Sequence, residues 1–137
     1  MPTDTPNPIG TLNEHSLHAA LKEYLAQSGD QQEVKLEGYF IDIVRGDELI
    51  EIQTGGFFPL KRKLKKLLKQ HVVHLYHPIA ARKWIVRVNK NDEFITKRKS
   101  PKKGSTFDLF DELLSLRSIA LHPNLWLHLL LVEVEEV

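Results

Sequence analysis

The chain has 137 residues, no cysteine and a formal net charge of +1 at pH 7. The length is typical of one domain with its own core, and the lack of cysteine excludes disulfides, thiolate metal sites and cysteine nucleophiles. The hydrophobic fraction of 42% and the charged fraction of 27% are those of an ordinary globular protein. No apolar run is long enough to span a bilayer and no signal-peptide pattern opens the chain, so we expect a cytoplasmic protein without a membrane anchor.

The N-terminal part predicts a tail, a helix and a strand. Residues 1–11 hold three prolines and few apolar side chains, and we expect them to form a flexible tail. The apolar spacing over Leu12–Ser28 predicts a helix. Glu14 and His18 lie four residues apart near its start and could meet on one face, but a solvated first turn is the better interpretation of the histidine. The alternating segment Glu33–Glu37 predicts a half-exposed strand.

The segment Ile41–Gln53, IDIVRGDELIEIQ, predicts a β-hairpin that turns at its Gly-Asp pair. In the predicted register Ile43 faces Ile50 and Asp42 faces Glu51, and alternation places the four isoleucines of the hairpin on one face. Two carboxylates directly opposite each other are unfavourable in a bare sheet. We therefore expect a cation between them, and a divalent metal is the simplest candidate. The alternative is two exposed acids, each screened by a nearby lysine.

The next segment predicts a basic helix and two strands. Leu60–Gln70 has the apolar spacing of a helix, and Val72–His77 and Lys83–Val88 have the composition of strands, with a turn expected at Pro78–Arg82. The leucines expected to be buried in this helix are Leu60, Leu64, Leu67 and Leu68.

Three histidines, His71, His74 and His77, recur at every third residue across the junction between that helix and the first of the strands. A strand places His74 and His77 on opposite faces. This spacing argues against a metal site made of the three histidines.

The remaining sequence predicts a hairpin, a loop, a helix and a last strand. Glu93–Thr96 is expected to complete a hairpin, Lys97–Ser105 to form a basic loop, and Trp126–Val134 to form a strand at a sheet edge or against a partner. Because the sequence stops within that strand, we expect the natural protein to continue past Val137. Phe107–Leu116 predicts an amphipathic helix, with its inward side chains expected to be Phe107, Phe110, Leu113 and Leu114 and its outward ones Asp108, Asp111 and Glu112.

The positive charge is concentrated in one part of the chain. Of the 19 lysines and arginines, 15 lie between Lys61 and Lys103, which holds only two of the 18 acids. Two runs, KRKLKKLLK and KRKSPKK, supply most of them. Such a segment can present a basic surface to a polyanion, whereas the alternative is several solvated faces that point in different directions.

This order of elements, with two carboxylates on the hairpin, resembles the PD-(D/E)XK nuclease superfamily, which includes Holliday-junction resolvases and many restriction endonucleases. The matching residues are Asp42 and the run Glu51-Ile52-Gln53, and Glu14 matches the helix-borne acid of the resolvase-like branch. The resemblance implies a restriction-endonuclease-like α/β fold in one domain over residues 12–137. An αβββαβ core with a mixed sheet flanked by helices would span residues 12–77, and a β/α extension residues 78–137. The phrases LNEHSLHAALK, IDIVRGDELIEIQT and HPIAARKWIVRV also look like a group of uncharacterised prokaryotic proteins.

The resemblance implies metal-dependent hydrolysis of phosphodiester bonds in DNA, with RNA as the alternative substrate. Asp42, Glu51 and the backbone carbonyl of Ile52 would hold Mg²⁺ or Mn²⁺. Glu14 would approach the metal directly or through water, and Gln53 would orient the attacking water. The family pattern has lysine where Gln53 stands, and glutamine can hydrogen-bond a water but supplies no charge. We hypothesise that a lysine at the start of the following helix supplies it, with Lys61 and Lys63 as the candidates.

The resemblance also implies a nucleic-acid partner, which the basic runs would bind mainly through phosphate. Two other functions stay open: a catalytically inactive relative that binds nucleic acid, and an interaction domain whose sheet edge or basic face binds protein. A strand at a sheet edge would also allow a homodimer. The residues expected to bind nucleic acid are Lys61, Arg62, Lys63, Lys65, Lys66, Lys69, Lys97, Arg98, Lys99, Lys102 and Lys103.

Overall fold

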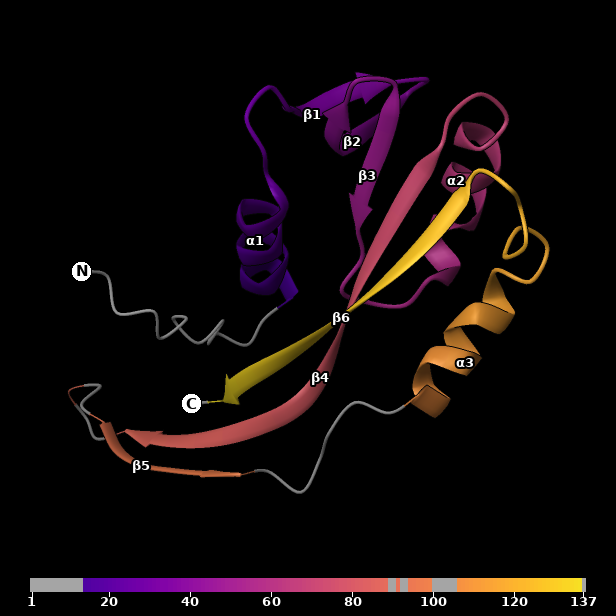
Figure 1. The fold of residues 1–137 in the computed structure, drawn as a ribbon. Helices are drawn as coiled ribbons and strands as arrows, with labels where there is room; N and C mark the ends of the chain where they lie inside the picture. Colours follow the sequence, from indigo (N-terminus) through magenta and orange to yellow (C-terminus); the bar gives the residue numbers. More distant parts are fainter. Residues whose placement is uncertain (1–13, 89–90, 92–93, 100–105, 137) are drawn as a thin grey trace.

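The computed structural model describes residues 14–88, 91, 94–99 and 106–136 (Figure 1). The tail expected at residues 1–11 and the end of the expected basic loop, residues 100–105, lie outside this part. No helix in the described part is long and apolar enough to cross a membrane. The elements in chain order are α1 (Glu14–Leu25), β1 (Gln31–Leu36), β2 (Tyr39–Arg45), β3 (Glu48–Ile52), the 3₁₀ helix η1 (Phe58–Leu60), α2 (Lys61–Leu67), β4 (Val73–Val88), β5 (Phe94–Lys99), α3 (Thr106–Ser115) and β6 (Leu125–Glu136).

The strands form one mixed sheet of six strands, which confirms the predicted α/β class. Strands β1, β2 and β3 are antiparallel neighbours. The connection through η1 and α2 then brings β4 back parallel to β3, as a crossover helix does between parallel strands. Strand β6 pairs parallel with β4 and has it as its one neighbour among the described strands, so the edge position predicted for the last strand is confirmed.

The predicted hairpin forms in the predicted register. Arg45 pairs with Glu48 and Ile43 with Ile50, and the turn uses Gly46 at a φ of +63°, a conformation in which a residue without Cβ is favoured. All four isoleucines of the hairpin are buried. Turn chemistry and alternation therefore determine this part of the fold locally.

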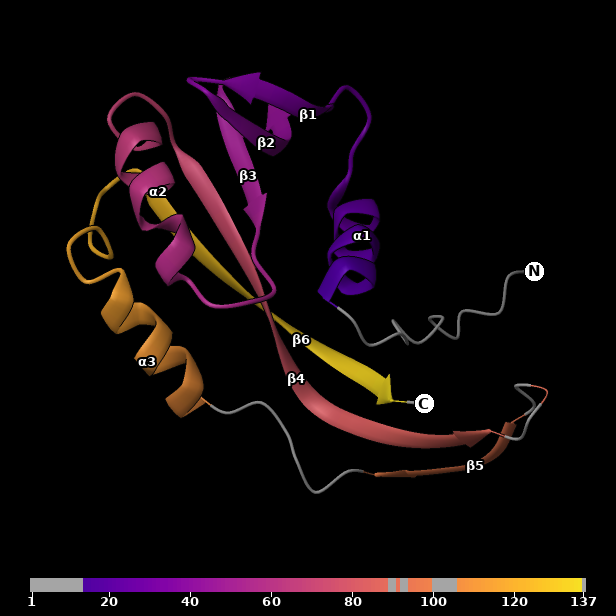
Figure 2. The same ribbon diagram turned by 180° about the vertical axis from the view of Figure 1, so that it is seen from behind.

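Helices α2 and α3 cover one face of the sheet, and α1 lies on the other side of β2 and β3 (Figures 1 and 2). The predicted leucine stripe is confirmed, because all four leucines from η1 to the residue that follows α2 are buried. They pack with Phe57, Leu49 and Leu75 into the main core. Leu21 of α1 is buried on the opposite side.

The turn expected at Pro78–Arg82 does not form. Strand β4 is continuous over 16 residues and pairs with β6 along most of its length. Pro78 is tolerated because β3 ends beside Tyr76, so the backbone nitrogen of the proline faces no strand on that side. The register with β6 shifts between Ala80 and Arg82, so the residue between them has no paired partner on β6. Strand β4 is strongly curved (Figure 1).

Two further predictions of element boundaries and faces need correction. Strand β5 extends to Lys99, beyond the expected end at Thr96, because Lys97 to Lys99 pair with β4.

In α3 the buried side is rotated from the predicted one: Leu109 is 8% exposed, whereas Phe110 is 60% exposed. Glu112, expected to face outward, accepts a hydrogen bond from the Phe57 backbone nitrogen at 2.6 Å. The side chains of Phe107 and Asp108 lie outside the described part.

Candidate active site

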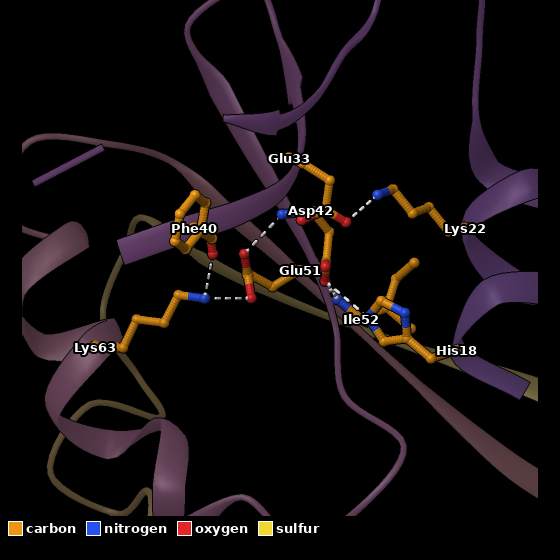
Figure 3. A network of polar contacts seen from close by, with 8 residues as sticks. All are labelled: His18, Lys22, Glu33, Phe40, Asp42, Glu51, Ile52 and Lys63. Atoms are coloured by element: carbon orange, nitrogen blue, oxygen red, sulfur yellow. Dashed lines mark hydrogen bonds and ion pairs between the residues drawn. The ribbon is translucent and has the colours of Figure 1, made fainter. Parts of the chain in front are cut away.

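Asp42 and Glu51 lie where the β2–β3 ladder opens. The backbone pairing of the two strands stops at Ile43 and Ile50. Beyond that pair, hydrogen bonds from backbone to side chain link the strands. The backbone nitrogen of Asp42 donates to Oε1 of Glu51 at 3.1 Å, and that of Ile52 donates to Oδ2 of Asp42 at 2.8 Å (Figure 3). The predicted carboxylate pair is therefore brought together, with each carboxylate bonded to the backbone of the opposite strand.

The ladder on the other side of Asp42 is also interrupted. The β1–β2 register passes from Gln32–Ile43 to Val34–Ile41 without pairing Glu33 with Asp42. Glu33 has a φ of +52°, a left-handed conformation that costs a non-glycine residue about 1 kcal/mol. Its carboxylate pairs with Lys22 of α1. Backbone strain held by tertiary contacts is a feature of functional sites more often than of plain sheet.

Lys63 supplies the positive charge at this cluster. Its Nζ atom donates to Oε2 of Glu51 at 2.8 Å and to the backbone carbonyl of Phe40 at 2.8 Å (Figure 3). Glu51 is only 4% exposed, so it is not the solvated acid of the alternative interpretation. Burial raises the pKa of Glu51, the charge of Asp42 raises it further, and the Lys63 ammonium lowers it. The structure thus places one of the two hypothesised lysines directly on the carboxylate pair.

His18 is a site residue for which the sequence-based expectation was wrong. It was expected in a solvated first turn, but its Nε2 atom lies 3.2 Å from Oδ2 of Asp42. The contact arises because His18 lies one helical turn before the buried Leu21 on the face of α1 that meets the sheet. The three-residue spacing between His18 and Leu21, which places both on one face of α1, is the sequence signal that could have identified His18.

Of the other two predicted catalytic residues, Gln53 turns away from the carboxylates, whereas the position of the Glu14 side chain is not described. Glu14 is the first residue of α1, and its side chain lies outside the described part. The side-chain amide of Gln53 donates to the carbonyl of Gly56 at 2.8 Å, and its backbone nitrogen donates to the backbone carbonyl of Tyr76 at 2.9 Å. Gln53 is therefore held in the loop that follows β3.

The cations of α2 and of the turn that follows it differ in exposure and in their contacts. Lys66 is exposed, but its Nζ atom donates to the carbonyl of Glu37 at 3.0 Å and lies 5.7 Å from the centre of the Tyr39 ring. Lys61 is half-buried. Arg62 and Lys65 of α2, and Lys69 in the turn after it, are also exposed. The predicted contacts at Lys97, Arg98, Lys99, Lys102 and Lys103 concern side chains outside the described part.

The donor set fits a hard divalent cation. Carboxylate oxygens are the ligands that Mg²⁺ prefers. Burial raises the pKa of Glu51 and the neighbouring Asp42 charge raises it further, and a cation beside the pair would oppose both effects. Within the described residues no group of three or more His, Asp or Glu side chains has the geometry of a metal site. Mg²⁺ would therefore take most of its ligands from water and substrate phosphate, as it usually does.

The fold and site define an α/β domain with a buried carboxylate–lysine cluster on a mixed sheet. The chain belongs to the family described as Domain of unknown function (DUF8091), whose model matches residues 15–137. An uncharacterized protein of Treponema pallidum (strain Nichols) is 38% identical over 130 residues, which is 94% of this chain. The chain spans about half of that relative, 52% of its length. No solved structure matches the chain.

Proposed function

We propose that this domain is a metal-dependent nuclease that hydrolyses phosphodiester bonds in DNA, and that it acts in the cytoplasm. The observation that carries the proposal is the cluster of Asp42, Glu51 and Lys63, which gathers at the opening between β2 and β3. The order α1–β1–β2–β3–α2–β4, with β3 and β4 parallel, supports a restriction-endonuclease-like core. Strands β5 and β6 with α3 would then form the extension.

The residues of the cluster have distinct roles in this proposal. Asp42 and Glu51, with the carbonyl of Ile52, would hold Mg²⁺ or Mn²⁺, and the bound metal would lower the pKa of a water and stabilise charge on the phosphate. Lys63 lowers the pKa of Glu51 against the effect of burial and would add positive charge beside the scissile phosphate. His18 fixes the orientation of the Asp42 carboxylate.

Exposed cations on α2 and in the turn after it would hold the nucleic-acid backbone. Arg62 and Lys65 lie three residues apart on α2, Lys69 lies in the turn that follows the helix, and all three are exposed. Contacts to phosphate make binding strongly dependent on salt and nearly independent of base sequence. We therefore expect each exposed cation to contribute to affinity for DNA of any sequence.

The direct test is cleavage of supercoiled, linear, single-stranded and branched DNA, with and without Mg²⁺ or Mn²⁺. The test variants are Asp42→Asn, Glu51→Gln and Lys63→Met, and the matched controls are Asp47→Asn in the exposed turn and Lys35→Met on the exposed side of β1. We expect metal-dependent cleavage that each test variant reduces at least a hundredfold and that the controls leave unchanged. Cleavage that survives the double change Asp42→Asn/Glu51→Gln would rule out this site.

A second candidate function is nucleic-acid binding without cleavage. It is favoured by Gln53, whose amide is engaged by Gly56 and which cannot carry the charge of the lysine that the family pattern has there. In that case Mg²⁺ produces no cleavage of any substrate, while gel-shift affinity still falls steeply between 50 and 200 mM salt. Binding that is unaffected by salt would exclude this candidate.

A further inference from the structure

A second cluster of titratable side chains lies on the opposite face of the sheet from Glu51. Nδ1 of His74 on β4 lies 2.8 Å from Nε2 of His128 on β6. In the parallel register Ile50 pairs with His74 and Glu51 pairs with Leu75. Since side chains alternate along a strand, the imidazole pair and Glu51 project from opposite faces.

The two imidazoles are oriented by their surroundings. Oε1 of Glu48 lies 3.2 Å from the outer nitrogen of His74, Nε2. When that nitrogen donates its proton to the carboxylate, Nδ1 of His74 carries a lone pair that points at His128. The ring of Tyr76 is stacked on His128 with centroids 4.2 Å apart, and the ring of Trp126 lies along His74 at 6.3 Å. Both imidazoles are thus held with ring nitrogens face to face.

We propose that His74 and His128 form a binding site for a divalent transition-metal ion that prefers nitrogen ligands, such as Zn²⁺, Cu²⁺ or Ni²⁺. A carboxylate on the far nitrogen of a metal-binding histidine is the usual supporting arrangement, and Glu48 occupies that position. The two facing nitrogens would need to separate by about half an ångström to accommodate metal–nitrogen bonds of about 2.1 Å. The side chain of His74 is 21% exposed, so water can complete the coordination.

Two properties distinguish this site from the proposed Mg²⁺ site. Its donors are imidazole nitrogens, which suit transition metals, whereas the carboxylates of Asp42 and Glu51 suit Mg²⁺. It also lies on the opposite face of the sheet from Glu51. The inference stands whether or not the domain cleaves DNA.

Tryptophan fluorescence tests the proposal, because the ring of Trp126 lies beside His74. The chain has two tryptophans, so a Trp84→Phe background isolates the signal. We expect Cu²⁺ or Ni²⁺ to quench it with one-to-one saturation and Mg²⁺ to leave it unchanged. His74→Gln or His128→Gln should weaken binding at least tenfold, and Glu48→Gln about tenfold, as expected for a supporting carboxylate.

His71→Gln, outside the cluster, is the matched control and should leave the binding curve unchanged. Imidazole nitrogen NMR spectra of the unmodified protein give a second readout that needs no variant, with Zn²⁺ shifting Nδ1 of His74 and Nε2 of His128. Quenching that persists in the His74→Gln/His128→Gln double variant would overturn the proposal. So would Zn²⁺-dependent shifts confined to other histidines.

Discussion

Replacing Lys63 with methionine leaves Glu51 as a buried carboxylate without its cation. The side chain of Glu51 is 5% exposed and that of Lys63 is 16% exposed. Removing one partner of a buried ion pair costs about 3–5 kcal/mol, and we take the lower end because Lys63 retains some solvent contact. We therefore expect Lys63→Met to lower the free energy of unfolding by about 3 kcal/mol, or the melting temperature by about 10 °C. The exposed Lys65→Met is the matched control and should change stability by less than about 0.5 kcal/mol.

The free energy of unfolding should also depend on pH through the titration of Glu51. A carboxyl whose folded-state pKa lies above its unfolded value of 4.5, as for Glu51, binds more protons when folded. The free energy of unfolding therefore falls as the pH rises from that value through the folded-state pKa. Because Lys63 lowers the pKa of Glu51, Lys63→Met should raise that pKa and extend the fall to higher pH.

Urea denaturation of the single and double variants at several pH values measures both effects. If the loss comes from the orphaned charge of Glu51, the double variant Lys63→Met/Glu51→Gln should be more stable than Lys63→Met alone. We expect a coupling energy of at least about 1.5 kcal/mol between the two positions. Additive single losses, or a loss no larger than that of Lys65→Met, would refute the reasoning.

Three other measurements test the fold. Leu109→Ala should lower the free energy of unfolding in urea by about 2–3 kcal/mol and Phe110→Ala by less than 1 kcal/mol, and the reverse order would contradict the orientation of α3. Gly46→Ala should cost about 1 kcal/mol in the same assay because φ is +63° there, while Gly46→Asn should cost less; equal losses would argue against a left-handed turn residue. The Arg45 hydrogen bonds lower the pKa of Asp30 from 3.8 to about 2, so stability should fall as the pH drops through that window. Asp30→Asn should flatten that fall in acid denaturation, and an unchanged curve would exclude the linkage.

The sequence was sufficient for the features that depend on near neighbours. The hairpin was predictable because the Gly-Asp turn and the alternation of isoleucines act over a few residues. The leucine stripe of α2 follows from helical spacing alone. The sequence limited the residue that supplies positive charge to Lys61 or Lys63. The contact between Lys63 and Glu51 depends on how α2 packs across the sheet.

The features that were missed depend on distant partners. In α3, apolar residues at positions 109, 110, 113 and 114 allow more than one face of the helix to turn inward. The observed orientation brings Glu112 into contact with the backbone of Phe57, 55 residues away. The continuity of β4 through Pro78 depends on pairing with β6, which local signals do not show. His74 and His128 are 54 residues apart and meet only because those two strands are parallel neighbours.

The same pairing has a consequence for the order of folding. Leu49 pairs with Val73 across 24 residues (73 − 49), but Val73 pairs with Leu125 across 52 (125 − 73). Longer loops cost more entropy to close and form contacts more slowly, so the hairpin and β3–β4 pairing should precede the docking of β6. Until β6 docks, β4 presents an unpaired edge with apolar side chains such as Leu75. The chain is therefore most exposed to intermolecular strand pairing in that interval, before its last described strand is in place.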